Sequence, residues 1–168
     1  MRRDAFLTRM GVAIGIACFV WGCCSTLRGD ILAIGDVRPA LPWDGDTEAW
    51  IGDTGDGELL VNLGSVLQCA GAYLGHHVGV SGIVTVTGGG SKWTTGGLRV
   101  GCHGNGRLIV EDGAEVSSDW SSLGCRAGSE GTAIVSGSGS KWYSRALSVG
   151  EYGTGRLTVA DGGFVSTR

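Results

Sequence analysis

Residues 82–119 read GIVTVTGGGSKWTTGGLRVGCHGNGRLIVEDGAEVSSD, and they return 49 positions later as residues 131–168, GTAIVSGSGSKWYSRALSVGEYGTGRLTVADGGFVSTR. Of these 38 aligned pairs, 19 are identical. A repeat at a fixed spacing indicates a protein that stacks one structural unit on the next, so that neighbouring units bury each other's apolar side chains. The repeat therefore predicts a stacked, repetitive architecture.

Two series of glycines divide each 49-residue unit into two related halves. The first series follows an apolar residue and consists of Gly52, Gly75, Gly101, Gly124 and Gly150. The second series opens a short apolar run and consists of Gly57, Gly82, Gly106, Gly131 and Gly155. The mean spacing is half of 49, or 24.5 residues. We therefore predict about five coils of 24–25 residues, with glycines at corners that require positive φ angles.

The apolar runs alternate as β-strands do. In residues 107–111 the equivalents of Leu108 and Val110 stay apolar in every coil, while the residue between them varies. A third apolar position recurs at Leu67, Val116 and Val165. An apolar period of two residues indicates strands with one inward face. Coils with three short strands each, hydrogen-bonded in parallel at a spacing of about 4.8 Å, form a parallel β-helix, or β-solenoid.

We therefore predict an all-β fold, a parallel β-helix (β-solenoid) of about five rungs in residues 50–168. The alternative is a β-propeller or another meander array, whose units run to about 40–50 residues, and the short half-period disfavours it. The composition agrees with a turn-rich β protein, because it has 33 glycines, 2 prolines and 42% hydrophobic residues. Such a composition fits neither a disordered linker, nor collagen, nor a helical domain.

Residues 1–27 have the layout of a secretory signal peptide. A positive start is followed by the almost wholly apolar residues 11–21 and then by small residues. The positive charges are those of Arg2, Arg3 and Arg9. An uncleaved membrane anchor is an alternative, because the uncharged stretch is close to the length of a membrane span.

The tetrapeptide at residues 20–23 resembles a lipoprotein box, with Cys23 as the lipidated residue. Lipidation is thus a second alternative to simple cleavage. Residues 28–49 then form a linker and an N-terminal cap before the repeats. We expect an exported protein, located outside a bacterial cell or on its outer surface, with membrane contact only through the N-terminal segment.

A motif that occurs twice carries a resemblance to a known family. It reads Val-Thr/Ser-Gly-x-Gly-Ser-x-Trp, then Leu-x-Val-Gly, then Gly-x-Leu-x-Val-x-x-Gly-x-x-Val. The copies occupy residues 86–93, 98–101 and 106–116, and residues 135–142, 147–150 and 155–165. The motif resembles the repeat of type V secretion (autotransporter-like) passengers and PEP-CTERM-associated bacterial surface proteins. The resemblance covers about residues 50–168 and implies an exported, repetitive β-helical surface protein.

The companion modules of that family are not seen after the repeat. They are a C-terminal β-barrel or a Pro-Glu-Pro sorting signal with a membrane stretch, whereas the sequence stops at Arg168 inside a coil. We expect either a fragment or a short relative whose open end is covered by another chain. Oligomerisation through the open end of the solenoid is therefore one prediction.

The residues after the first glycine series form a column of mostly polar side chains, which we expect to face solvent. The column consists of Asp53, His76, Cys102, Cys125 and Glu151. Cys102 and Cys125 are expected on adjacent coils with Cα atoms about 5 Å apart, within the range of a disulfide. Export favours this bridge. The alternative is two reduced thiols, because directly opposed parallel strands orient their Cβ atoms poorly for bridging. Cys69 has no partner by this spacing.

The next column contains Thr54, His77, His103, Arg126 and Tyr152. His76, His77 and His103 are thus expected near the two cysteines, and imidazole and thiolate groups are ligands that zinc prefers. The sequence has no Cys-x-x-Cys pair, however, and Arg126 places a fixed positive charge beside the patch. We expect solvated turn residues here, with no metal and no cofactor.

Trp93 and Trp142 are equivalent positions of the 49-residue repeat. As exposed, ligand-facing aromatics they would bind sugar rings. As core residues they would cover the interior at a corner, with the indole N–H satisfied by a turn carbonyl. Repetition favours the core interpretation, because repeated positions reflect what the scaffold needs. Trp43 and Trp50 are expected to cap the first coil.

The function that this pattern favours is a non-catalytic exported or cell-surface scaffold with adhesive potential, not an enzyme. The alternative is a carbohydrate-binding module that uses the repeated tryptophans. A third hypothesis is a β-helix polysaccharide lyase or hydrolase, with a local group of carboxylates: Glu111, Asp112, Glu115 and Asp119. Expected partners are surface polysaccharide or other surface proteins. The net charge of −3 and the spread of basic residues predict no nucleic-acid partner.

Overall fold

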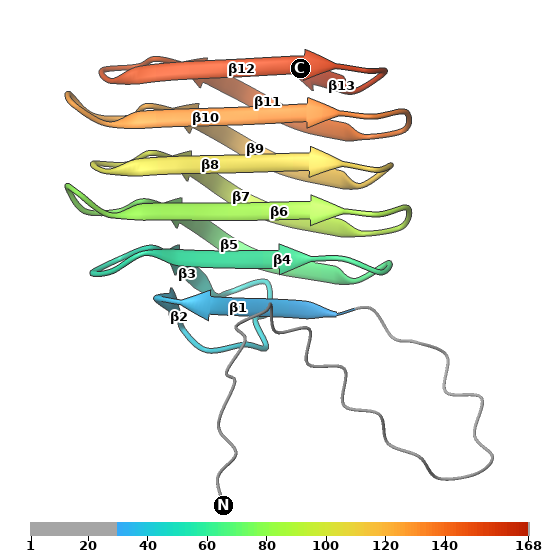
Figure 1. Ribbon diagram of the computed structural model, residues 1–168, viewed down its shortest axis with the longest axis horizontal. Helices are drawn as coiled ribbons and strands as arrows, with labels where there is room; N and C mark the ends of the chain where they lie inside the picture. Colours follow the sequence, from blue (N-terminus) through green and yellow to red (C-terminus); the bar gives the residue numbers. More distant parts are fainter. Residues whose placement is uncertain (1–29, 168) are drawn as a thin grey trace, which may run out of the picture.

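The computed structural model describes residues 30–167, and every regular element within them is a β-strand (Figure 1). The strands are β1 (Ile31–Gly35), β2 (Val37–Arg38), β3 (Glu48–Ile51), β4 (Gly57–Val61), β5 (Val66–Leu74), β6 (Ser81–Thr87), β7 (Lys92–Val100), β8 (Asn105–Glu111), β9 (Glu115–Leu123), β10 (Glu130–Ser136), β11 (Lys141–Val149), β12 (Thr154–Ala160) and β13 (Phe164–Thr167). The chain winds upward in about five coils. The predicted parallel β-helix is confirmed, and the β-propeller is excluded.

The strands form two sheets that run the length of the stack. Sheet A has the order β1-β4-β6-β8-β10-β12, and sheet B has the order β13-β11-β9-β7-β5-β3-β2. From β4 and β3 onward all pairs are parallel. Their register places Val86 beside Val110 and Val110 beside Val135. The predicted columns of equivalent residues are therefore correct.

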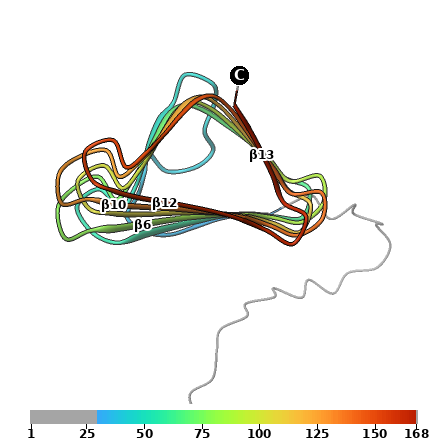
Figure 2. The same cartoon turned by 90° about the horizontal axis from the view of Figure 1, so that it is seen from above.

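The cross-section of the stack is a triangle (Figure 2). Sheet A forms one side, and each long strand of sheet B bends to form the other two. The bend shows as a gap in the pairing, because Cys69 and Gly71 have partners on β7 while Ala70 has none. Two strands per coil, one of them bent, replace the three separate strands that we expected. The coil rises in the right-handed sense in Figure 1, as parallel crossover connections in one sheet almost always do.

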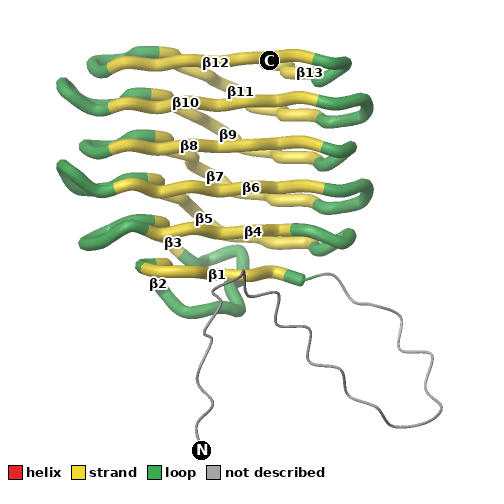
Figure 3. The backbone as a smooth tube through the Cα atoms, in the orientation of Figure 1, coloured by secondary structure: helices red, strands yellow, loops and turns green. Residues whose placement is uncertain are grey.

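The two glycine series have different physical causes. Glycines of the first series, such as Gly101 with a φ of 73°, turn the corner in the left-handed region, as predicted. Gly106 of the second series has no positive φ. A Cβ atom there would collide with the backbone of Gly101 and Val100. The second series is therefore required by the close approach of the chain on either side of the corner (Figure 3).

The interior is a continuous apolar column, and bulky and smaller side chains alternate along it. The bent strands place Leu67, Trp93, Val116, Trp142 and Val165 over one another. An indole thus lies on every second coil, with a smaller aliphatic side chain above and below it. Parallel coils are only about 4.8 Å apart, so this alternation fills the interior without overpacking.

An antiparallel cap closes the first coil. Strand β1 pairs antiparallel with β4, and β2 pairs antiparallel with β3. Trp43 is buried against this end and donates its indole N–H to the carbonyl oxygen of Pro39 at 2.8 Å. The prediction that Trp43 caps the first coil is confirmed. Trp50 instead lies on the outer face of β3, since the side chains on either side of it in the strand, Ala49 and Ile51, point inward.

Candidate functional site

The corner between sheet B and the next strand of sheet A gathers the unusual polar residues of the chain. The turns at this corner stack, and their backbones bond from coil to coil: the N–H of His76 donates to Gly52 O at 2.8 Å, and the N–H of Cys125 donates to Gly101 O at 2.9 Å. Residues after the first glycine series therefore lie in one column, as the sequence predicted. We call His76, His77, His103, Cys102 and Asp53 the corner cluster.

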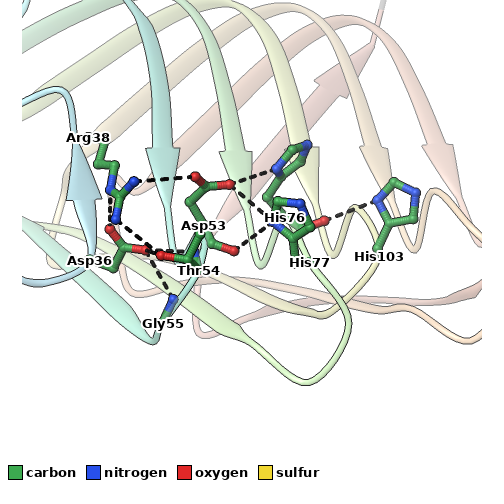
Figure 4. Close-up of polar contacts among 8 residues, drawn as sticks. All are labelled: Asp36, Arg38, Asp53, Thr54, Gly55, His76, His77 and His103. Carbon is green, nitrogen blue, oxygen red and sulfur yellow. Dashed lines mark hydrogen bonds and ion pairs between the residues drawn. The ribbon is translucent and has the colours of Figure 1, made fainter.

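Asp53 orients two imidazoles of the corner cluster (Figure 4). Its Oδ1 atom lies 2.8 Å from Nδ1 of His76 and 3.1 Å from Nδ1 of His77. The Nδ1 atom of His77 also lies 2.8 Å from the backbone oxygen of Asp53. Both Nδ1 atoms carry a proton in this arrangement, because their partners can only accept.

His103 repeats this pattern one coil further on. Its Nδ1 atom lies 3.0 Å from the backbone oxygen of His76 (Figure 4). A carbonyl oxygen accepts only, so the proton of the neutral His103 ring lies on Nδ1. In each neutral ring the lone pair then lies on Nε2. The sequence predicted that all three histidines lie near Cys102. This is confirmed for His76 and His103, because a ring nitrogen of each and the sulfur of Cys102 all lie within 4.8 Å of one another.

A second carboxylate, Asp36, fixes the base of this corner. Its Oδ2 atom accepts hydrogen bonds from the backbone N–H of Gly55 at 3.0 Å and from the hydroxyl of Thr54 at 3.0 Å, and Arg38 donates to its Oδ1 atom at 2.6 Å. Desolvation raises the pKa of Asp36, but these bonds, together with that from the Thr54 N–H, outweigh it and lower the pKa to about 2. Arg38 also lies 3.8 Å from Asp53 and so links the two carboxylates.

The exposure of Cys102 and Cys125 differs from the sequence-based expectation. Their column was expected to face solvent, yet the two residues are only 5% and 6% exposed. Together with Arg99, Trp120 and Arg126 they line a hollow of about 430 Å³, whose other side chains cover them. A corner position is therefore not exposed simply because polar residues occupy it in neighbouring coils.

Cys102 and Cys125 are free thiols in the structure, and they interact. The hydrogen bond from Cys102 lowers the pKa of Cys125 to about 7 against the effect of burial, with help from the Ser122 hydroxyl at 2.9 Å and from Arg99. The same bond and burial raise the pKa of Cys102. The pair therefore shares one negative charge more readily than an ordinary pair of thiols. The Cys102–Cys125 disulfide stays a prediction.

The ligand-facing interpretation of Trp93 and Trp142 is wrong. Both side chains are 0% exposed and lie in the core. The indole N–H of Trp142 donates to the hydroxyl of Ser118 at 3.3 Å rather than to a turn carbonyl, and the indole nitrogen of Trp93 has no hydrogen-bond partner. The core interpretation is therefore correct in position, although the expected N–H partner is not.

Sequence reasoning missed a stack of outer side chains on sheet B. Trp50 and Tyr73 stack with ring centroids 5.8 Å apart, and the guanidinium of Arg99 lies 4.8 Å from the Tyr73 centroid and 4.2 Å from that of Trp120. The signal was available, because Trp50, Tyr73 and Arg99 each stand two residues before a glycine of the first series. The ring faces contact each other, so this stack stabilises the outer face instead of offering a flat sugar platform.

The remaining predicted features fall outside the corner. Cys23 and the predicted signal segment 1–27 lie outside the described residues. Among residues 30–167, no helix is long and apolar enough to cross a membrane.

No protein-family model matches the chain, and neither a curated protein nor a solved structure shows significant similarity to it. The fold and the corner cluster define a β-solenoid protein with one polar corner that departs from its repeat.

Proposed function

We propose that the protein is a non-catalytic scaffold of the β-solenoid class, exported to the bacterial cell surface, as its resemblance to autotransporter-like repeat proteins implies. The observation that carries the proposal is the column register. Equivalent residues lie over one another from β4 to β12 and from β3 to β13. Stacking of this kind produces a straight, rigid body with uniform outer faces, which suits display or spacing at a surface.

The local group of carboxylates supports a structural role. Glu115 lies 3.5 Å from the ammonium group of Lys92 on the preceding coil. Asp112 accepts a hydrogen bond of 3.0 Å from the Thr87 hydroxyl. Asp119 lies 3.7 Å from Arg145 on the following coil. These carboxylates hold neighbouring coils together, which favours a scaffold over the polysaccharide lyase or hydrolase.

The upper end of the stack supports assembly with another chain. Val149 and Val159 are 46% and 47% exposed, although the equivalent residues of lower coils, such as Val100 and Val110, are fully buried. Strands β12 and β13 are edge strands of their sheets among the described residues. Unpaired strand edges with apolar neighbours are templates for further pairing. We therefore propose that a second copy of the chain stacks on this end.

Export is tested with the full chain expressed in a bacterial host, followed by cell fractionation and mass spectrometry of the mature N-terminus. We expect the chain outside the cytoplasm, shortened by its leader and degraded when intact cells are treated with protease. A matched double variant, Arg2→Glu with Arg3→Glu, is expected to remain in the cytoplasm. Cys23→Ser distinguishes lipidation from simple cleavage. Recovery of the wild-type chain in the cytoplasm with an intact N-terminus would overturn the proposal.

The non-catalytic role is tested separately on the exported protein. Incubation with acidic and neutral polysaccharides is expected to release no reducing ends and no unsaturated products. Binding of the same polysaccharides, or of surface proteins, is then measured with the protein immobilised. Sustained turnover that is lost in Glu115→Gln or Asp119→Asn would establish an enzyme instead.

A further inference from the structure

We propose that His76, His103 and Cys102 form a binding site for a zinc ion. The proposal goes beyond the scaffold function and does not depend on it. It also departs from the expectation that these are merely solvated turn residues. The reasons are the convergence of the three side chains, the orientation of the imidazoles and the place where the repeat breaks.

The three donor atoms are close enough for one cation. One ring nitrogen of each histidine and the sulfur of Cys102 lie within 4.8 Å of one another. Around tetrahedral zinc, with Zn–N bonds of about 2.0 Å and Zn–S bonds of about 2.3 Å, donor atoms are about 3.3–3.6 Å apart. To bind one zinc ion, the side chains would have to rotate so that the donor atoms move about 1 Å closer to one another.

The His76 imidazole is oriented as the imidazole of a metal-binding histidine usually is. Nδ1 of His76 donates to the Asp53 carboxylate at 2.8 Å, and Nδ1 of His103 donates to the His76 carbonyl oxygen at 3.0 Å. The bond to Asp53 leaves a lone pair on Nε2 of His76. The His103 ring turns its bonded Nδ1 atom toward His76 (Figure 4), so this ring must rotate to offer its Nε2 atom to the same cation. A carboxylate or carbonyl behind a histidine is the second shell that fixes the tautomer of zinc-binding imidazoles. These hydrogen bonds are a separate observation from the distances between the three donor atoms, and they support the same site.

The alternative group of Asp53, His76 and His77 also has donor atoms within 4.8 Å of one another. In that group, however, the Asp53 Oδ1 atom already accepts from both Nδ1 atoms. A cation there would have to displace two protons and break both bonds. Asp53 therefore orients the site, and His77 lies beside it without being a ligand.

Charge and ligand type favour a borderline-soft cation. Binding replaces the thiol proton of Cys102 with a sulfur–metal bond, and the proton passes to the buffer. A thiolate with two neutral imidazoles is a ligand set for zinc, and it leaves a fourth position for water or the neighbouring thiol of Cys125. The positive side chains of Arg99 and Arg126 line the same hollow as Cys102 and Cys125 and favour a thiolate there. The Asp53 carboxylate contacts His76 at 2.8 Å.

The repeat breaks where the site lies. In the coil 49 residues further on, Cys102 and His103 are replaced by Glu151 and Tyr152, while Gly101 and Gly104 on either side of them are retained as Gly150 and Gly153. The turn keeps its glycines from coil to coil, whereas the side chains between them vary. The cysteine and histidine are thus additions to a turn that folds without them.

The test uses the full chain with the Cys125→Ser substitution under reducing conditions, so that no disulfide competes for Cys102. Titration with Co²⁺ is expected to give a sulfur-to-cobalt charge-transfer absorption at one equivalent, and Zn²⁺ should abolish it. Cys102→Ser is expected to lose the band. His76→Ala or His103→Ala should weaken binding at least tenfold, and Asp53→Ala about 10–100-fold. His77→Ala is the matched control and should bind as its parent does.

These measurements test the zinc site separately from folding and from export. Circular dichroism of every variant checks that the coils are intact, since the outward side chains of a turn contribute little to the strands. The proposal is overturned if no charge-transfer band appears, if Cys102→Ser retains the band, or if His77→Ala weakens binding as much as His76→Ala. Failure of export would leave these results unchanged.

Discussion

Replacing Cys69 with serine should stabilise the protein, because it supplies the hydrogen bond that Trp93 lacks. The equivalent indole, Trp142, donates to the hydroxyl of Ser118 on the preceding coil at 3.3 Å. Cys69 occupies the position of Ser118 one double coil earlier, and it offers only a thiol. The buried Nε1 atom of Trp93 consequently has no hydrogen-bond partner.

The size of the effect follows from this comparison. A typical intramolecular hydrogen bond contributes about 0.5–1.5 kcal/mol, and a buried unsatisfied donor costs about 1–3 kcal/mol. Serine is slightly smaller than cysteine and less apolar, which offsets part of the gain. We expect Cys69→Ser to raise the free energy of unfolding by about 1 kcal/mol. Cys69→Ala, which removes the sulfur without adding an acceptor, should lower it.

The assay is urea denaturation followed by far-ultraviolet circular dichroism under reducing conditions, with an unchanged denaturant slope as the check on the unfolding transition. The indole N–H resonance of Trp93 should also move in the nuclear magnetic resonance spectrum of Cys69→Ser. The reciprocal variant, Ser118→Cys, should destabilise the protein by about 1 kcal/mol. The reasoning is refuted if Cys69→Ser is no more stable than Cys69→Ala, or if Ser118→Cys has no effect.

Three further predictions concern the core, the corners and acid stability. Trp142→Leu should cost about 2–3 kcal/mol of unfolding free energy by denaturant titration, whereas Trp120→Leu, at an outer position that is 40% exposed, should cost less than about 1 kcal/mol. Gly106→Ala should lower the thermal midpoint strongly because its Cβ meets backbone, whereas Gly89→Ala, with open space around it, should not. Because the pKa of Asp36 is lowered to about 2, its contribution is complete above pH 4 and disappears as the pH falls through 2. Asp36→Asn should therefore cost about 1 kcal/mol at pH 7, after allowance for solvent screening, and progressively less as the pH falls from 4 through 2, when the two proteins are compared by urea denaturation.

The columns could be predicted from the sequence because a parallel stack transmits sequence spacing directly into space. Val110 and Val135 are beside each other because they follow their glycines by the same number of residues. The same arithmetic placed His76 and Cys102 on adjacent coils. It also contained the outer stack of Trp50 and Tyr73, but identity at a spacing of 49 residues does not mark this stack, because Arg99 stands 49 residues after Trp50.

Burial at the corners could not be predicted in this way. Spacing says which residues share a column, but it does not say how deeply a corner column lies. For Cys102 and Cys125 this depth depends on the long side chains around them, such as Arg99. The hydrogen bond behind each imidazole also depends on side-chain rotamers. Sequence alone therefore identified the members of the corner cluster but predicted the wrong exposure for Cys102 and Cys125, whereas His77 and His103 are exposed as expected.

The motif that carries the family resemblance is explained by packing within the coils. Ser91 is fully buried, and its hydroxyl accepts the N–H of Gly64 on the preceding coil at 3.0 Å. Ser140 accepts the N–H of Gly113 in the same way at 3.0 Å. The serine thus ties two turns together beside the buried indole two residues later in the sequence. The Gly-Ser-x-Trp pattern consequently reports how two coils are joined, not what the protein binds.

The 49-residue period has the same origin. In the core column Trp93 and Trp142 lie two coils apart with Val116 between them, so that bulky and smaller side chains alternate. Each indole coil has the four-residue turn with the serine, at residues 88–91 and 137–140, and the valine coil between them has a three-residue turn at residues 112–114. Residues that follow this period are required by the scaffold. The search for a specific activity should therefore concentrate on residues that violate the period, and the members of the corner cluster are residues of this kind whose donor atoms converge.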